Sequence, residues 1–128
     1  MNVLFIEDDP MNRRVVADML DVAGAAMTEA ESAEIGLKLI DERDFEMALV
    51  DLRMPGMDGI TAIERIRARP DAKAKLPIIV VTADTAIDLR ERCIAAGANE
   101  VLFKPVAMDA LFEAMGRILA GGEGDVIL

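Results

Sequence analysis

The chain has 128 residues, of which 53% are hydrophobic and 30% are charged, a balance that is typical of one globular domain and excludes intrinsic disorder. Its formal net charge of -10 argues against nucleic acid or an anionic membrane surface as a direct partner, because either contact would begin with repulsion. The absence of histidine excludes Ser-His catalysis and histidine-based metal sites, and the single cysteine, Cys93, cannot form an internal disulfide.

Short apolar runs alternate with helical patterns through the first half of the chain. Residues 3–6 predict a buried strand, and apolar side chains at helical spacing predict a helix over about residues 11–23. Residues 26–30 favour a weaker second strand. Ser32 is the expected N-cap of a second helix, which runs to about Asp41.

The same alternation continues through the second half. The predicted strands cover residues 47–51, 77–82 and 101–103, and the predicted helices cover about 58–69, 85–96 and 108–119. Asp58 is the expected N-cap of the first of these helices, which ends before Pro70. Cys93 occupies an apolar position of the second, so we expect it to be buried rather than redox-active.

Repeated strand–helix units favour parallel pairing through right-handed crossovers, with helices on both faces of the sheet. We therefore predict an α/β fold with a doubly wound five-stranded parallel sheet in the flavodoxin-like order 2-1-3-4-5. Residues 1–120 form one domain in this prediction, and residues 121–128 form a flexible C-terminal tail that starts glycine-rich and ends apolar. No run approaches the ~18 apolar residues that a membrane span needs, so we expect a cytoplasmic protein.

Polar side chains follow the apolar runs at the points where the predicted strands end. Glu7 and Asp8 follow the first strand, Asp51 ends the third, and Thr82 and Lys104 close the fourth and fifth. A Pro-Gly turn comes soon after Asp51. Because the carboxyl ends of parallel strands lie along one edge of the sheet, these residues are expected to meet in one crevice.

Three carboxylates in one crevice repel one another unless a cation neutralises them. Oxygen ligands without histidine or thiolate favour a hard cation such as Mg²⁺. Any one of these acids alone could be a helix cap or a solvated loop residue, Thr82 a plain strand residue and Lys104 a surface charge. Together, the acids, the hydroxyl and the ammonium suit phosphoryl transfer to Asp51.

The chain resembles the receiver domain of bacterial two-component response regulators over about residues 2–119. The resemblance is carried by four motifs in the same order: Glu7-Asp8, Asp51-x-x-Met54-Pro55-Gly56-Met57-Asp58-Gly59, Val81-Thr82-Ala83 and Lys104-Pro105. Residues 9–13 also resemble receivers that work with hybrid sensor kinases and stand-alone, single-domain (DivK-like) regulators.

The resemblance implies a phosphoacceptor and a metal site. By resemblance, Asp51 accepts the phosphoryl group, and Mg²⁺ is bound by Asp8, Asp51 and the backbone carbonyl of Arg53. Glu7 acts through a metal-bound water. Asp9 falls just past the acidic pair and is expected to cap the first helix.

The resemblance also implies a switch. By resemblance, Thr82, followed by Ala83, is the switch residue, Lys104 contacts the phosphoryl group, and the bond from Lys104 to Pro105 is a cis peptide. Receivers usually carry an aromatic residue three positions before the lysine, and here that position is Val101. Without a ring to bury, the signal is expected to pass through loop and helix shifts around residues 82–94.

The implied function is that of a single-domain response regulator. A sensor histidine kinase or a histidine phosphotransfer protein would phosphorylate it, and phosphorylation would switch binding to a downstream protein. The expected protein is a monomer or weak dimer that slowly loses its phosphoryl group and is not a turnover enzyme. Alternatively, the chain is a receiver domain excised from a larger hybrid kinase or multidomain regulator.

Two other functions fit the sequence less well. A hydrolase of the haloacid dehalogenase type needs a second acid two residues after the nucleophile, and Arg53 occupies that place. A scaffold that is never phosphorylated would be expected to lack the acid, the threonine or the lysine, and none is missing.

Two surfaces near the crevice are also predicted from the sequence. Arg53 and Asp84 lie two residues after Asp51 and Thr82, so they are expected to pair as a partial lid over the pocket. The phosphodonor surface is expected to combine the first helix with the loop after the fifth strand. Its candidate residues are Met11, Arg14, Val15, Asp18, Pro105, Val106 and Ala107. Met11 and Val15 could instead be core residues.

Overall fold

The computed structural model describes residues 1–124 and contains one five-stranded sheet in the order β2-β1-β3-β4-β5, with every neighbouring pair parallel. The strands are β1 (Asn2–Ile6), β2 (Ala26–Ala30), β3 (Met47–Val50), β4 (Ile78–Thr82) and β5 (Glu100–Phe103). The helices are α1 (Pro10–Val22), α2 (Ala33–Glu42), α3 (Gly59–Arg67), the short η1 (Ala72–Lys75), α4 (Leu89–Ala96) and α5 (Met108–Gly124). The predicted fold and strand order are confirmed.

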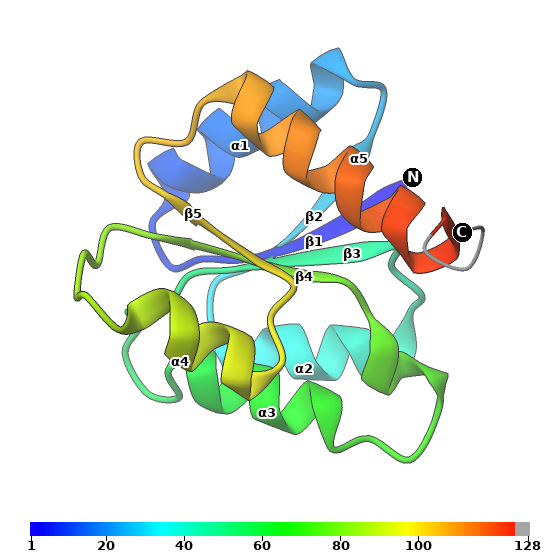
Figure 1. Ribbon diagram of the computed structural model, residues 1–128, viewed down its shortest axis with the longest axis vertical. Coiled ribbons are helices and arrows are strands. Elements are labelled where there is room, and N and C mark those ends of the chain that lie inside the picture. The colour runs from blue at the N-terminus through cyan, green and yellow to red at the C-terminus, as the bar shows by residue number, and fades with distance from the viewer. Residues whose placement is uncertain (125–128) are drawn as a thin grey trace.

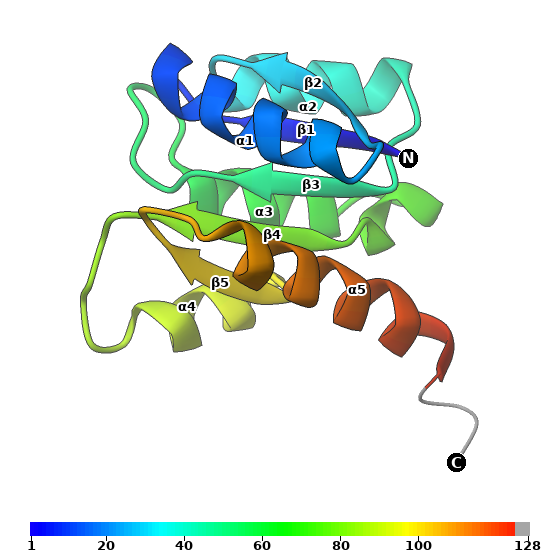
Figure 2. The same cartoon turned by 90° about the horizontal axis from the view of Figure 1, so that it is seen from above.

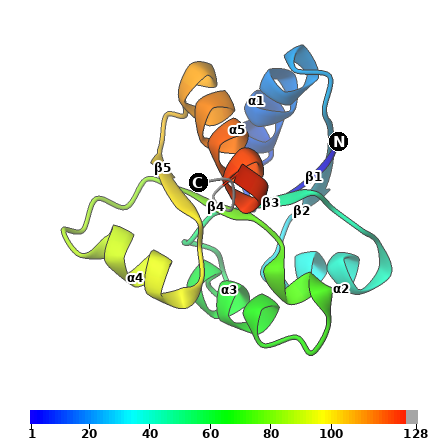
Figure 3. The same cartoon turned by 45° about the vertical axis from the view of Figure 1, so that its right-hand side comes forward.

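Helices cover both faces of the sheet. Helices α1 and α5 lie on one face, and α2, α3 and α4 lie on the other (Figures 1 and 3). Because successive strand residues point to opposite faces, each strand feeds both cores. Leu4 and Ile6 pack toward α2, α3 and α4, whereas Val3 and Phe5 pack toward α1 and α5. This double coverage explains why β1, β3 and β4 are continuous apolar runs.

All the strands run in the same direction, so the loops that follow them gather at one edge of the sheet (Figure 2). The edge carries the connections from β1 to α1, from β3 to α3, from β4 to α4 and from β5 to α5. This is the edge at which the sequence predicts a crevice. Among the described residues, no helix is long and apolar enough to cross a membrane.

Helix α4 begins at Leu89, four residues later than the predicted start at residue 85. Local side-chain hydrogen bonds explain the difference. The hydroxyl of Thr82 accepts a hydrogen bond from the N–H of Asp84 (3.1 Å), and the Asp84 carboxylate accepts one from the N–H of Ala86 (3.0 Å). Such bonds offer the backbone an alternative to the helix, so residues 83–88 form a loop.

Helix α5 ends at Gly124, beyond the predicted end at residue 119. The first four residues of the predicted tail, 121–124, are therefore helical, and residues 125–128 lie outside the described part of the chain. Glycine costs about 1 kcal/mol relative to alanine inside a helix, but extending an existing helix avoids the cost of nucleation. The helix therefore continues through the paired glycines at which the predicted tail begins.

Candidate functional site

Asp51 is the first residue after β3, and its position is fixed by the neighbouring strand. Its backbone N–H donates a hydrogen bond to the carbonyl of Ile6 at the end of β1 (2.9 Å). Asp51 is buried, so its carboxylate is not solvated as an exposed loop side chain would be. The predicted strand ends at Asp51, whereas the observed β3 ends one residue earlier, at Val50.

Glu7 and Asp8 follow β1 directly, beside Asp51. Glu7 is only 1% exposed, and its backbone N–H donates to the carbonyl of Ala30 at 2.9 Å. Asp8 is exposed. One carboxylate oxygen from each of Glu7, Asp8 and Asp51 lies within 4.8 Å of the others. Asp9 does not join this group: it is the N-cap of α1 and accepts from the N–H of Met11 at 2.9 Å.

Lys104 supplies the positive charge in this acidic group. Its ammonium lies 2.7 Å from a Glu7 oxygen and 3.6 Å from an Asp51 oxygen. Burial alone would lower the pKa of Lys104, but the hydrogen bond to Glu7 and the charge of Asp51 outweigh it and raise the pKa above its ordinary value. Lys104 is therefore fully charged at neutral pH.

The backbone around Lys104 is tied to β4. The N–H of Lys104 donates to the carbonyl of Thr82 (2.8 Å), and the peptide bond from Lys104 to Pro105 is cis. Thr82 is fully buried at the end of β4, whereas Ala83, which follows it, is exposed. Val101 is buried in the core beneath α2, α3 and α4.

Arg53, in the loop after β3, and Asp84, in the loop after β4, form an ion pair. An Arg53 guanidinium nitrogen lies 3.3 Å from an Asp84 carboxylate oxygen, and the arginine side chain is largely exposed. The hydrogen bond from the N–H of Ala86 lowers the pKa of Asp84 below its ordinary value, and Arg53 acts in the same direction. Opposite charges therefore pair between the two loops that follow Asp51 and Thr82.

The donor set of this site fits a small hard cation. Three carboxylates are offset by one ammonium, so the group keeps a net negative charge when its acids are ionised. All the ligand atoms are oxygen, and Asp8 is open to solvent, which suits an ion that retains water ligands such as Mg²⁺. Glu7, Asp8 and Asp51 are the residues that would hold it.

Sequence reasoning missed Arg13, which touches this site from α1. Its guanidinium donates to the backbone carbonyl of Glu7 (2.7 Å) and to the carboxylate of Glu29 on β2 (2.8 Å). A charged residue on a helix is usually solvated, and nothing in the spacing of Arg13 marks it as different. The contact depends on the side-chain conformation, which periodicity does not encode.

A hollow of about 140 Å³ adjoins the acidic group between α1 and the loop after β5. Its lining is mainly apolar and consists of Phe5, Asn12, Val15, Val16, Val81, Lys104, Pro105 and Val106. Met11 is 70% exposed and Val15 is 46% exposed. The interpretation of these two as core residues is therefore wrong: both are exposed apolar residues of α1, and Val15 lines the hollow.

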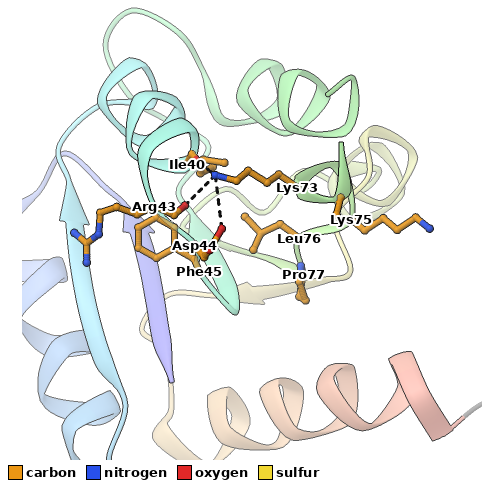
Figure 4. A pocket seen from close by; sticks show the side chains of 9 residues that line it. Ile40, Arg43, Asp44, Phe45, Lys73, Lys75, Leu76 and Pro77 are labelled. Atoms are coloured by element: carbon orange, nitrogen blue, oxygen red, sulfur yellow. Dashed lines mark hydrogen bonds and ion pairs between the residues drawn. The ribbon is translucent and has the colours of Figure 1, made fainter. Parts of the chain in front are cut away.

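A different hollow, of about 270 Å³, lies between the end of α2 and η1 (Figure 4). None of the predicted site residues lines it. Lys73 extends across it and donates to the carbonyls of Ile40 and Arg43, with the carboxylate of Asp44 at 3.8 Å. Since the last carbonyls of a helix lack partners within the helix, this lysine stabilises the end of α2. We therefore assign this hollow a structural role at the end of α2 and not a role in the candidate site.

Comparisons with known proteins agree with this geometry. The family model described as the response regulator receiver domain matches residues 3–116. The sensor histidine kinase RcsC of Escherichia coli is 32% identical over 115 residues, which cover 90% of this chain and 12% of the kinase. The sensor histidine kinase AruS of Pseudomonas aeruginosa is 36% identical over 119 residues, covering 92% and 12%. The chain thus spans about an eighth of these relatives.

Two solved structures show the same fold. A putative response regulator from Chloroflexus aurantiacus matches with a TM-score of 0.88 and 31% identity, covering 93% of this chain and 97% of that one. The receiver domain of the sensor histidine kinase PA1611 from Pseudomonas aeruginosa matches with a TM-score of 0.84 and 30% identity, covering 93% and 97%. In that structure, a magnesium ion is coordinated in the active site cleft.

Proposed function

The chain belongs to the response regulator receiver domain family of two-component systems, and from this premise we propose that Asp51 accepts a phosphoryl group from a phosphohistidine in a Mg²⁺-dependent reaction. The observation that carries the proposal is the contact of Lys104 with both Glu7 and Asp51 beside Asp8. The single ammonium offsets only one of the three carboxylates. The remaining negative charge is available to bind a metal ion, and the lysine and the metal together can neutralise a phosphoryl group.

In the proposed reaction, an Asp51 carboxylate oxygen attacks phosphorus in line. The new phosphorus–oxygen bond forms as the phosphorus–nitrogen bond of the phosphohistidine breaks, and the ring, which carries a proton on its other nitrogen, leaves as neutral imidazole. Lys104 faces the developing charge, because it already lies 3.6 Å from Asp51. Bound Mg²⁺, held by Asp8, Asp51 and the Arg53 carbonyl with Glu7 acting through water, would supply further charge neutralisation. The Thr82 hydroxyl would then donate a hydrogen bond to an oxygen of the added group.

We propose that the phosphorylated state is read through the loop between β4 and α4. Thr82 currently accepts a hydrogen bond from the N–H of Asp84, so its turn toward a phosphoryl group would break that bond and release the loop. Val101 offers no ring that could move inward, and it is already packed in the core. A shift of residues 83–88 and the start of α4 is therefore the proposed signal to a downstream protein.

The proposed phosphodonor is a helical histidine kinase or histidine phosphotransfer protein that docks on α1 and the loop after β5. Exposed Val15 lines the apolar hollow together with Pro105 and Val106, and exposed Met11 lies on the same helix. Apolar anchors of this kind suit a helix laid against a groove. Ala107 lies on the same loop. This placement would bring the donor histidine to Asp51.

Charge reversal on α1 tests this surface. Arg14 and Asp18 form an exposed i,i+4 pair at 3.4 Å, with side chains 80% and 69% exposed. Because exposed pairs contribute only about 0–1 kcal/mol, Arg14→Glu and Asp18→Lys should leave folding intact. We expect phosphotransfer from the cognate donor to change tenfold or more, with labelling by acetyl phosphate unchanged. Equal loss of both activities would show that α1 acts only through folding.

The ion pair between Arg53 and Asp84 is proposed to slow hydrolysis of the phosphoryl group by hindering the approach of water. We expect Arg53→Ala and Asp84→Ala each to change the dephosphorylation rate severalfold, with labelling by acetyl phosphate largely intact, since about 1.36 kcal/mol on a barrier is tenfold in rate. Decay of the labelled protein measures this. If the double variant decays with the product of the two single effects, the residues are uncoupled and there is no joint lid.

We propose a single-domain regulator that binds a downstream protein, as a monomer or weak dimer, and that is not a turnover enzyme. The similarity to a putative response regulator from Chloroflexus aurantiacus supports this context. The alternative, a receiver excised from a hybrid kinase, is supported by relatives of which the chain spans 12%. The mass of the native protein in cell extracts of its source distinguishes the two.

A phosphotransfer screen tests the central proposal. The purified chain would be incubated with each histidine kinase and phosphotransfer protein of its source organism, in Mg²⁺ and in EDTA. We expect fast labelling by one or a few donors, only in Mg²⁺. Failure of every histidine donor and of acetyl phosphate to label the chain in Mg²⁺ would refute the proposal.

A further inference from the structure

The carbonyl of Glu7 lies at the point where the chain leaves the sheet. The last backbone bond at this end of β1 is the one from the Glu7 N–H to Ala30. In the part of the chain that the structure describes, no backbone N–H donates to the Glu7 carbonyl. The residue is only 1% exposed, and a buried carbonyl without a partner is costly. Its partner is the Arg13 guanidinium, at 2.7 Å.

Arg13 is itself held in place by a second contact. Its Nε donates to a Glu29 oxygen on the edge strand β2 at 2.8 Å, and its side chain is only 13% exposed. One planar guanidinium thus joins α1, β2 and the loop after β1. An arginine offers several donors in a fixed fork, and the point charge of a lysine cannot reproduce that geometry.

We propose that Arg13 is a positioning residue for the metal site. The inference rests on the proposed Mg²⁺-dependent function. The carbonyl of Glu7 and the N–H of Asp8 belong to one planar peptide, so a donor that fixes the carbonyl fixes the direction in which Asp8 leaves the backbone. The peptide joins two of the three proposed metal-site acids. Arg13 therefore sets the spacing of Glu7 and Asp8 before a cation arrives.

A purely electrostatic role for Arg13 would have the opposite sign. A positive charge beside the acids repels a cation, so its removal alone would tighten Mg²⁺ binding. Loss of positioning would weaken binding instead. The charge of Arg13 is already paired with Glu29, which reduces its field at the acids. We therefore expect the positioning effect to be larger.

Isothermal titration with Mg²⁺ on the unphosphorylated protein tests the sign. We expect Arg13→Gln to raise the dissociation constant about tenfold, which corresponds to about 1.4 kcal/mol. The double variant Arg13→Gln/Glu29→Gln keeps the net charge of the wild type and should show a similar loss. Arg13→Lys keeps the charge without the fork and should not restore binding. Arg65→Gln, which removes the charge of an exposed arginine on α3, should bind within twofold of wild type.

Unfolding by urea in EDTA shows whether the Arg13→Gln protein is folded under the conditions of the titration. Arg13→Lys keeps the positive charge, so a weakening of Mg²⁺ binding by about tenfold in this variant cannot come from electrostatics and tests the inference even if Arg13→Gln folds poorly. A folded Arg13→Gln protein that binds Mg²⁺ as tightly as wild type, or more tightly, would overturn the inference, as would full rescue by Arg13→Lys. A wild type that binds no Mg²⁺ would instead refute the proposed function.

Discussion

Asp51→Asn should abolish phosphorylation by acetyl phosphate and by any histidine donor. The wild type should gain one phosphoryl group per chain in Mg²⁺, whereas the variant should gain none, because a neutral amide is a poor nucleophile and a weaker ligand for Mg²⁺. Intact-protein mass spectrometry measures the incorporation. The substitution is nearly isosteric, and Lys104 keeps its contact with Glu7 at 2.7 Å. We therefore expect the free energy of unfolding to change by only about 1 kcal/mol or less.

A matched control comes from the same acidic stretch. Asp9 is exposed and caps α1, and asparagine is as good an N-cap as aspartate. Asp9→Asn should therefore keep both the helix and the labelling. Labelling that survives in Asp51→Asn would place the acceptor elsewhere, with Asp8 and Asp9 as the first residues to test.

The convergence of the site residues could be predicted because it depends on sheet topology alone. In a parallel sheet, every residue that ends a strand reaches the same edge, whatever its side-chain conformation. The apolar runs before Glu7, Asp51, Thr82 and Lys104 were long enough to mark those ends. The position of the edge and the members of the site therefore follow from periodicity and strand order.

The contacts within the site could not be predicted in the same way. Sequence reasoning directed Lys104 toward the acceptor, whereas the structure places its ammonium nearer to Glu7, at 2.7 Å, than to Asp51, at 3.6 Å. The late start of α4 depends on the Asp84 carboxylate, which competes for a backbone N–H. The hydrogen bond from Arg13 to the Glu7 carbonyl depends on one rotamer of the arginine side chain. Each of these is a choice between local partners of similar energy, and residue spacing does not resolve such choices.

Asp8→Asn should abolish phosphorylation and raise the Mg²⁺ dissociation constant tenfold or more, yet leave the chain at least as stable as wild type in EDTA. One oxygen from each of the three acids lies within 4.8 Å of the others, and repulsion between two such charges is about 1–3 kcal/mol at effective dielectric constants of about 80 to 20. Asp8 is exposed, so the repulsion energy that its charge adds lies at the low end of this range. Lys104 contacts Glu7 and Asp51 and leaves Asp8 uncompensated.

The measurable signature is a reversal of stability with Mg²⁺. A ligand at 100 times its dissociation constant stabilises the folded state by about 2.7 kcal/mol, and the variant should lose most of this gain. Urea unfolding should therefore rank Asp8→Asn at or above wild type in EDTA and below it in Mg²⁺. Asp58→Asn, which replaces the N-cap of α3 with an equally good cap, should follow wild type in both conditions. If Asp8→Asn binds Mg²⁺ as tightly as wild type, Asp8 is not a ligand, and the affinity must come from Glu7 and Asp51.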